Sequence, residues 1–171
     1  MYRALTLSII LSFAFCLLPG CGESLPPGMP RLYPAIITVT QEGTPLEGAT
    51  VQLIPEDQAN AQWGPGGTTN ASGVAVLYTN ARFRGAPLGE YRVTVTKRET
   101  EPHPHPELSG GDRAQLAEFM RIAQSLKTYN YVEPQYSSIT ETPLRIEITA
   151  RERNYEVDAG QQVRIEARLM R

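Results

Sequence analysis

Alternation of apolar and polar residues recurs along much of this chain, and it limits the fold to one built mainly of sheets. Successive side chains of a strand point to opposite faces, so an alternating segment buries one face and exposes the other. That pattern is typical of antiparallel sheets packed on a shared core. The apolar positions of the five alternating segments are Ile37 and Val39; Ala49, Val51 and Leu53; Tyr91, Val93 and Val95; Leu144, Ile146 and Ile148; and Val163, Ile165, Ala167 and Leu169. The last segment alternates most regularly, whereas Val74 to Tyr78 is apolar on both faces and predicts a central strand or one that is covered on both faces.

Glycines fall where these strands end or begin, at Gly43, Gly48, Gly73 and Gly89. The segment Asn70-Ala71-Ser72-Gly73 fits a type I turn, in which Asn at the first position caps the backbone and Gly at the fourth tolerates a positive φ. The strands are therefore predicted to follow one another through tight turns.

One segment, from Asp112 to about Tyr129, has helical periodicity instead. Its apolar residues at helical spacing are Leu116, Phe119, Met120, Ala123 and Leu126. Asp112 can cap the start of the helix, and Pro134 prevents its continuation. We expect this helix to cover a sheet edge or an open end of the sheets, and binding of a partner is the alternative.

The first residues predict export from the cytoplasm. A basic start at Arg3 is followed by an apolar run from Leu5 to Leu18, which is too short to span a bilayer, and residues 1–20 are interpreted as a signal peptide. Leu18-Pro19-Gly20-Cys21 resembles the bacterial lipobox, which implies that Cys21 is lipidated, with palmitate among its acyl chains, and begins the mature protein. Ordinary cleaved secretion is the competing interpretation.

A proline-rich segment follows Cys21, and residues 21–34 are interpreted as a tether because proline favours extended backbone. Residues 35–171 suit one domain. The net charge of −2 gives no basic footprint, so a nucleic-acid partner is not expected. By resemblance to sorting signals of double-membrane bacteria, Gly22 after the lipidated cysteine implies an outer-membrane anchor, facing the periplasm or the surface.

Three motifs together resemble a carboxypeptidase regulatory-like domain: Gly-x-Pro-Leu-x-Gly-Ala-x-Val at 43–51, Thr-Asn-x-x-Gly at 69–73 and Leu-Gly-x-Tyr-x-Val at 88–93. The segment from Tyr136 to Leu144 is similar to the ending of small bacterial lipoproteins of this family. The resemblance implies an all-β, seven-stranded Greek-key β-sandwich of the transthyretin (prealbumin) type, with one inserted α-helix and an insertion at about 99–143. It also implies a non-catalytic accessory, adhesive or surface module without a cofactor.

Enzymatic relatives of that fold fit the chain less well. The chain ends in Arg168-Leu-Met-Arg171, not in the Tyr-Arg-Gly-Ser of transthyretin-related hydrolases. Intradiol dioxygenases use a His-x-His pair, but His103 and His105 here lie between prolines in a predicted loop. The donors of His103, His105 and Glu107 would suit Zn²⁺ or Cu²⁺, so a metal-binding or metal-dependent protein is kept as the alternative function.

Aromatic residues near loops supply the remaining candidates. Trp63, in a glycine-rich loop, and Phe83, with Tyr78 before it, could contact a ligand or partner. The alternative for Trp63 is that it plugs an open end of the core. The sequence therefore predicts a non-enzymatic, lipid-anchored β-sandwich of the bacterial envelope that binds a protein or a glycan or has a structural role.

Overall fold

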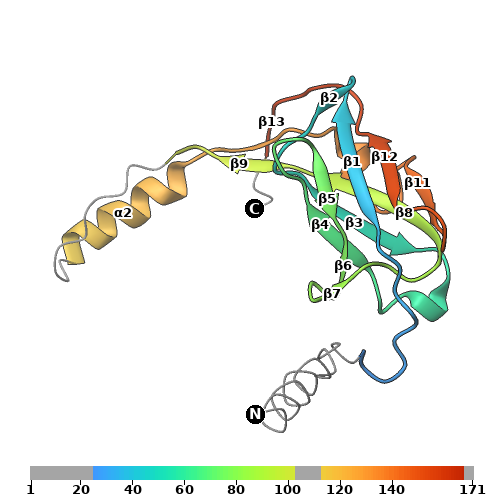
Figure 1. The fold of residues 1–171 in the computed structure, drawn as a ribbon. Helices are drawn as coiled ribbons and strands as arrows, with labels where there is room; N and C mark the ends of the chain where they lie inside the picture. Colours follow the sequence, from blue (N-terminus) through green and yellow to red (C-terminus); the bar gives the residue numbers. More distant parts are fainter. Residues whose placement is uncertain (1–24, 103–112, 168–171) are drawn as a thin grey trace, which may run out of the picture.

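The chain folds into two packed β-sheets and a ribbon that leaves them on one side (Figure 1). The computed structural model describes residues 25–102 and 113–167. These residues contain thirteen strands, two α-helices and one short 3-10 helix. The all-β class predicted from the alternating segments is confirmed.

The larger sheet has six strands in the order β11-β8-β3-β4-β6-β7. Their bounds are β11 (Arg145–Ile148), β8 (Gly89–Thr96), β3 (Thr50–Pro55), β4 (Pro65–Thr68), β6 (Tyr78–Thr79) and β7 (Phe83–Arg84). The central strands β3 and β8 pair antiparallel from Thr50 opposite Thr96 to Pro55 opposite Tyr91. The 3-10 helix η2 (Gln58–Asn60) connects β3 to β4, and the Asp57 carboxylate caps it by accepting a hydrogen bond from the amide of Ala59.

The smaller sheet is centred on β1 (Ile36–Gln41), which pairs antiparallel with β2 (Thr44–Pro45) and β5 (Val74–Val76). On its other side β1 pairs in parallel with β12 (Asn154–Asp158). The expectation of purely antiparallel sheets is wrong at this edge. β12 was also not among the predicted strands, although Tyr155 and Val157 alternate with polar residues and are only 7% exposed.

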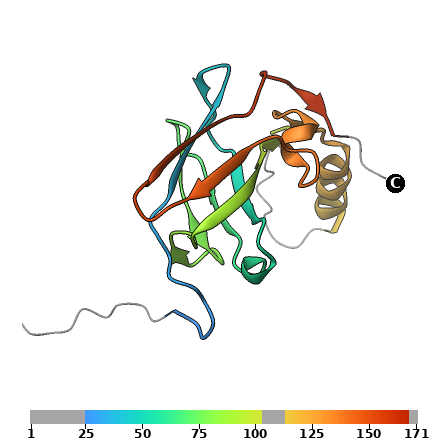
Figure 2. The ribbon, with the colours of Figure 1, turned by 90° about the vertical axis from the view of Figure 1, so that its right-hand side faces the viewer.

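The hydrophobic core lies between the two sheets, which Figure 2 shows as separate layers. Its fully buried side chains include Ile37 and Val39 from β1, Val51 and Leu53 from β3, and Tyr91, Val93 and Val95 from β8. These are the apolar positions that the alternation predicted. The sheets approach closely at Gly67 of β4, where an added Cβ would lie 2.5 Å from the carbonyl oxygen of Val76 in β5.

The predicted turn at Asn70 is present, and side-chain hydrogen bonds stabilise it. The Asn70 side-chain oxygen accepts hydrogen bonds from the amides of Ser72 and Val74, and Gly73 has a φ of +72°. Just before it, Thr69 is 4% exposed, and its hydroxyl donates to the carbonyl of Leu46 at 2.6 Å and accepts from the amide of Ala49 at 2.8 Å. The Thr-Asn-x-x-Gly motif therefore has a local structural cause.

The Leu-Gly-x-Tyr-x-Val motif also has a structural cause. The Tyr91 ring is 1% exposed, and its hydroxyl donates to the carbonyl of Pro87, four residues upstream, at 2.9 Å. Burial raises the pKa of Tyr91, so the hydroxyl stays protonated and remains a donor. A buried tyrosine bonded to the backbone a few residues upstream is an arrangement known as a tyrosine corner.

A three-stranded ribbon extends from the sandwich, in the order β13-β10-β9. Its strands are β9 (Arg98–Thr100), β10 (Thr128–Asn130) and β13 (Ile165–Glu166). α2 (Arg113–Ser125) lies beyond the end of the ribbon, away from both sheets (Figure 1). Leu116 and Met120 on α2 are each 52% exposed. The expectation that this helix covers a sheet edge or an open end is therefore wrong for the described residues, and its predicted cap, Asp112, lies outside them.

The most regular alternation in the sequence does not form a core strand. Of the described part of the predicted strand, residues 163–167, only Ile165–Glu166 forms a strand, and both residues are exposed. The ribbon there is held by polar contacts: the Arg164 guanidinium lies 4.0 Å from the centre of the Tyr129 ring, and Lys127 pairs with Glu166 at 3.1 Å. The end of the predicted strand, at Leu169, lies outside the described residues.

Part of the predicted insertion at 99–143 belongs to the sandwich. Val132 is 3% exposed, and the Thr142 hydroxyl, 2% exposed, donates to the carbonyl of Val93 in β8 at 2.6 Å. α3 (Pro134–Ser137) is a single turn that begins with Pro134, where the missing amide is tolerated. Tyr136 packs against the core, and its ring lies where a Cβ at Gly160 would be.

The N-terminal part of the described chain lies against the sandwich before β1 begins. Met29 is 9% exposed, and Tyr33 exchanges two backbone hydrogen bonds with Ala86, at 2.8 and 2.9 Å. Residues 29–33 of the predicted tether are therefore docked on the domain.

Candidate functional site

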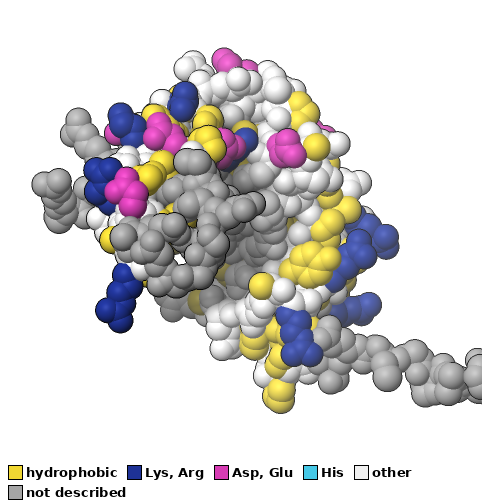
Figure 3. Space-filling model, turned by 90° about the vertical axis from the view of Figure 1, so that its left-hand side faces the viewer, with side chains coloured by type: hydrophobic (Ala, Val, Ile, Leu, Met, Phe, Trp, Pro, Cys, Tyr) yellow, Lys and Arg dark blue, Asp and Glu magenta, His cyan; other side chains and the backbone are white. Residues whose placement is uncertain are grey.

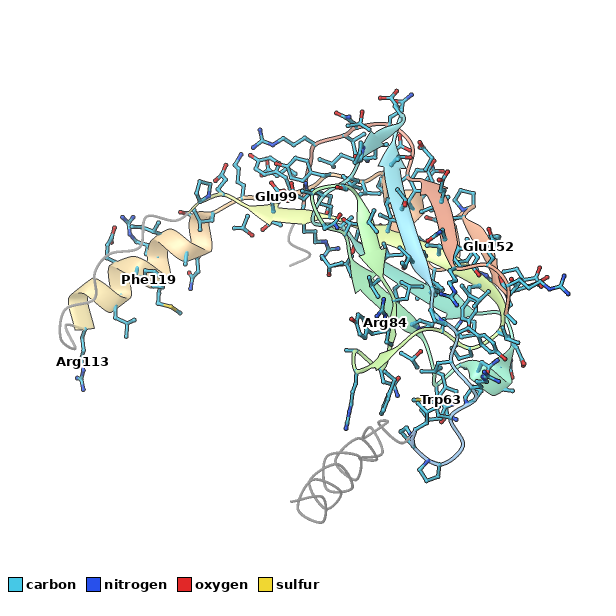
Figure 4. All side chains as sticks on the ribbon, viewed as in Figure 1. Trp63, Arg84, Glu99, Arg113, Phe119 and Glu152 are labelled. Carbon is cyan, nitrogen blue, oxygen red and sulfur yellow. The ribbon has the colours of Figure 1, made fainter. Side chains whose placement is uncertain are left out.

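Of the predicted site residues, Trp63, Tyr78 and Phe83 lie in the described part of the chain. Trp63 is half-buried, and Figure 4 places it with Arg84 at the end of the sandwich where the described chain enters. Phe83 is 7% exposed and carries the Arg82 guanidinium 5.1 Å from its ring centre, so its ring offers little surface to a ligand. Cys21, the lipidation residue, and His103, His105 and Glu107, the candidate metal ligands, lie outside the described residues.

A groove on the outer face of the larger sheet is the strongest candidate for a ligand site. Strand register aligns Gln52 of β3, Gly66 of β4 and Tyr78 of β6 side by side, because Gln52 pairs with Gly66 and Gly66 pairs with Tyr78. Gly66 has no side chain, so it leaves a depression between the Gln52 amide and the Tyr78 ring. The groove has a volume of about 470 Å³. It is lined by Thr50, Val51, Gln52, Gly64, Gly66, Gly67, Thr68, Tyr78 and Ala81.

The lining of this groove contains no ionisable carboxylate, ammonium or guanidinium group. Tyr78 is 39% exposed, so one large aromatic surface faces the solvent. The neighbouring groups are the Gln52 amide and the Thr50 and Thr68 hydroxyls, which both donate and accept hydrogen bonds. An exposed aromatic ring beside neutral donors and acceptors suits a neutral, polar ligand with an apolar face.

The rim of the groove contains a strained turn. Between β6 and β7, Asn80 and Ala81 have φ values of 52° and 55°, in the left-handed region that disfavours an alanine. Asparagine tolerates this conformation, but Ala81 stands where such hairpins usually have glycine. The turn is held by hydrogen bonds from the amide of Arg82 to the carbonyl of Thr79 at 3.2 Å and from the Thr79 hydroxyl to the carbonyl of Gly85 at 2.8 Å.

A second groove lies near the β11 edge of the same sheet, and its lining is charged. Ion pairs with a structural role account for Glu56 and Arg145 in that lining. Glu56 accepts two hydrogen bonds from Arg92, at 2.7 and 3.0 Å, and lies 3.4 Å from Arg145. The hydrogen bonds from Arg92 hold the pKa of the exposed Glu56 carboxyl below its usual value. A carboxylate kept ionised by paired guanidinium groups is a poor proton donor or acceptor at neutral pH, so this cluster offers no general acid or base.

The described part of the chain has neither a metal-binding cluster nor a membrane-spanning helix. Residues 25–102 and 113–167 contain no group of three or more His, Cys, Asp or Glu side chains placed to hold a metal ion. Within those same ranges, no helix has the length and apolar character needed to cross a bilayer.

Comparisons with known proteins add no relative. No protein-family model, no curated protein and no solved structure matches this chain.

Sequence reasoning identified Tyr78 and the glycine-rich loop but not the groove between them. The outward direction of Gln52 follows from its alternation with Val51 and Leu53, so the sequence could predict that Gln52 lies on the outer face of the sheet. The pairing of Gly66 with both Gln52 and Tyr78 was not, because strand order depends on contacts distant in sequence.

Proposed function

We propose that this protein is a non-enzymatic, lipid-anchored β-sandwich of the bacterial envelope that binds a neutral glycan in the groove between Gln52 and Tyr78. The observation that supports a glycan ligand is the composition of the groove. Its lining has an exposed aromatic ring, an amide and hydroxyls, and no charged group. Sugar rings present apolar C–H faces for stacking and hydroxyls for hydrogen bonding, so they match both features.

The proposal also includes the detailed topology of the fold. We propose a carboxypeptidase regulatory-like domain with the Greek-key topology of transthyretin. The tyrosine corner at Tyr91 and the turn at Asn70 to Gly73 support it, because both motifs have the structural roles expected of strand ends in such a sandwich.

The anchor and the compartment rest on the sequence. Cys21 follows a signal-like apolar run and a lipobox-like motif, and lipidation there would hold the domain at the outer membrane, facing the periplasm or the surface. In the sequence, seven residues lie between that cysteine and the docked residue Met29, so the domain would lie close to the bilayer.

Glycan binding is tested with the purified protein and defined neutral oligosaccharides, namely N-acetylglucosamine and glucose oligomers, by isothermal titration calorimetry. Tyr78→Ala should weaken binding roughly two- to ten-fold, because aromatic packing contributes about 0.5–1.5 kcal/mol beyond area burial. Ile139→Ala is the matched control, since Ile139 is 53% exposed and lies outside the groove lining. Equal affinities of the two variants for every bound sugar would exclude the groove as the site.

A further inference from the structure

The end of the sandwich where the described chain enters has an unusual charge distribution. The sequence from Gln58 to Gly89 contains no Asp or Glu but contains Arg82 and Arg84, and the sequence from Ser24 to Gln41 contains Arg31 and no acidic residue. These arginines are all exposed. A chain with more acidic than basic residues overall therefore has two acid-free segments with three basic side chains.

The fold brings these two segments together. The antiparallel bridge between Tyr33 and Ala86 places the residues around Arg31 beside those that carry Arg84 and Leu88. A Cβ at Gly85 would lie 2.5 Å from the carbonyl oxygen of Tyr33, which shows how closely the backbones pack. The basic side chains are therefore held on a rigid surface and not on a free tether.

Hydrophobic side chains are exposed in the same two segments. Leu25 is 39% exposed and Leu88 is 42% exposed. On the face drawn in Figure 3, the acidic side chains lie in the upper half, and the lower half shows basic and hydrophobic side chains without acidic ones. Asp57, which precedes the acid-free segment, is engaged in capping the η2 helix.

We propose that this surface, formed by Arg31, Arg82, Arg84, Leu25 and Leu88, docks on an anionic lipid bilayer and orients the domain. The inference rests on the proposed lipid anchor at Cys21. Met29 lies eight positions after Cys21 and is buried, and even a fully extended chain spans at most about 3.6 Å per residue, so the bilayer would lie within roughly 30 Å of Met29. A tether of this reach lets the domain approach until the guanidinium groups lie within a Debye length, about 10 Å, of the anionic headgroups that attract them, and the leucines can then enter the interface.

The test uses the full-length lipidated protein in vesicles of phosphatidylcholine, with or without phosphatidylglycerol. Trp63 is the single tryptophan of the chain and is at the docking end in Figure 4, so energy transfer from Trp63 to dansyl-labelled lipid headgroups reports how close this end lies to the bilayer. We expect higher transfer on anionic than on neutral vesicles. The difference should disappear in high salt, which screens exposed charges.

The variant Arg31→Gln, Arg82→Gln, Arg84→Gln should remove the anionic preference. Each basic residue near such a surface contributes about five-fold, so the ratio of docked to undocked protein should fall roughly a hundred-fold. The charge-matched control is Arg98→Gln, Arg113→Gln, Arg121→Gln, because these arginines lie on β9 and α2, outside the docking surface.

The outcomes distinguish failure of the docking surface from failure of the proposed lipid anchor. Protein that does not float with neutral vesicles lacks the lipid anchor, and both proposals then fall. Protein that floats but shows equal energy transfer on neutral and anionic vesicles, or an equal loss in the two triple variants, retains its anchor and refutes the docking surface alone.

Discussion

Replacing Thr69 with valine should destabilise the sandwich strongly, although the two side chains have nearly the same shape. The Thr69 hydroxyl joins the two ends of the loop before β3, since it donates to Leu46 and accepts from Ala49. Thr69, Leu46 and Ala49 are all buried, so water cannot replace the lost hydroxyl. Thr69→Val would therefore leave one carbonyl and one amide without partners.

The size of the effect follows from those two groups. An unsatisfied buried donor or acceptor costs about 1–3 kcal/mol, so two of them, with some relaxation of the loop, should lower the free energy of unfolding by about 2–4 kcal/mol. A domain of this size is typically stable by only about 5–15 kcal/mol. The substitution should therefore remove a large share of the total stability.

Equilibrium unfolding in urea, followed by far-UV circular dichroism, measures this loss. Thr68→Val is the control, because Thr68 is the neighbouring exposed threonine at the end of β4, and its change should stay within about 0.5 kcal/mol. Hydrogen exchange adds a local readout, since the amide of Ala49 should lose protection in Thr69→Val. If both variants unfold at the same urea concentration, the hydroxyl is not the link between these loop ends.

Two further substitutions test the packing and the pH dependence. Gly67→Ala should destabilise by about 1–3 kcal/mol in the same urea assay, because its Cβ would approach the Val76 carbonyl to 2.5 Å, and an unchanged midpoint would show that the sheets can separate there without cost. For Asp158, partial desolvation acts to raise the pKa, but hydrogen bonds from Gly160, Thr40 and Gly43 outweigh it and hold the pKa below the ordinary value of 3.8. A lowered folded-state pKa stabilises the protein above about pH 4, and that contribution is lost as the pH falls through the folded-state value. Thermal melts from pH 7 to pH 2 should therefore decline less steeply for Asp158→Asn than for the native chain, and parallel curves would contradict the assignment.

The core could be predicted from the sequence because its signal is local. Alternation at Val51 and Leu53, and at Tyr91, Val93 and Val95, specifies which face of each strand is buried without reference to the partner strand. The turn at Asn70 was predictable for the same reason, since an Asn side chain bonds its own backbone two and four residues later.

The errors concern where an amphipathic element is placed. The residues from Val163 to Ala167 alternate regularly, but β13 pairs with the ribbon strand β10, where no second sheet covers its apolar side. β12 has the same kind of pattern and reaches the core because it pairs with β1. The pattern specifies an apolar face in both cases, and only contacts distant in sequence decide whether that face is covered.

The groove could be predicted only in part, for a related reason. Tyr78 and Gly66 lie twelve positions apart, and the sequence contains nothing that requires them to be neighbours. They become neighbours because β6 pairs antiparallel with β4, although β5, which lies between these strands in sequence, belongs to the other sheet. Site residues on paired strands thus depend on register, which local patterns do not determine.

The proposed groove and the proposed docking surface share one structural element, the β6–β7 hairpin. Tyr78 contributes to the groove, and Arg82 and Arg84 follow it after the tight turn at Asn80 and Ala81. Because hydrogen bonds hold this hairpin, a glycan in the groove would be kept near the bilayer when the arginines are docked. The two functions should nevertheless separate by mutation: the triple arginine variant should bind short neutral oligosaccharides with unchanged affinity, and Tyr78→Ala should retain the preference for anionic vesicles. Loss of both properties in either variant would mean that the hairpin itself had unfolded, which the loss of hydrogen-exchange protection at the amides of Arg82 and Gly85 would reveal.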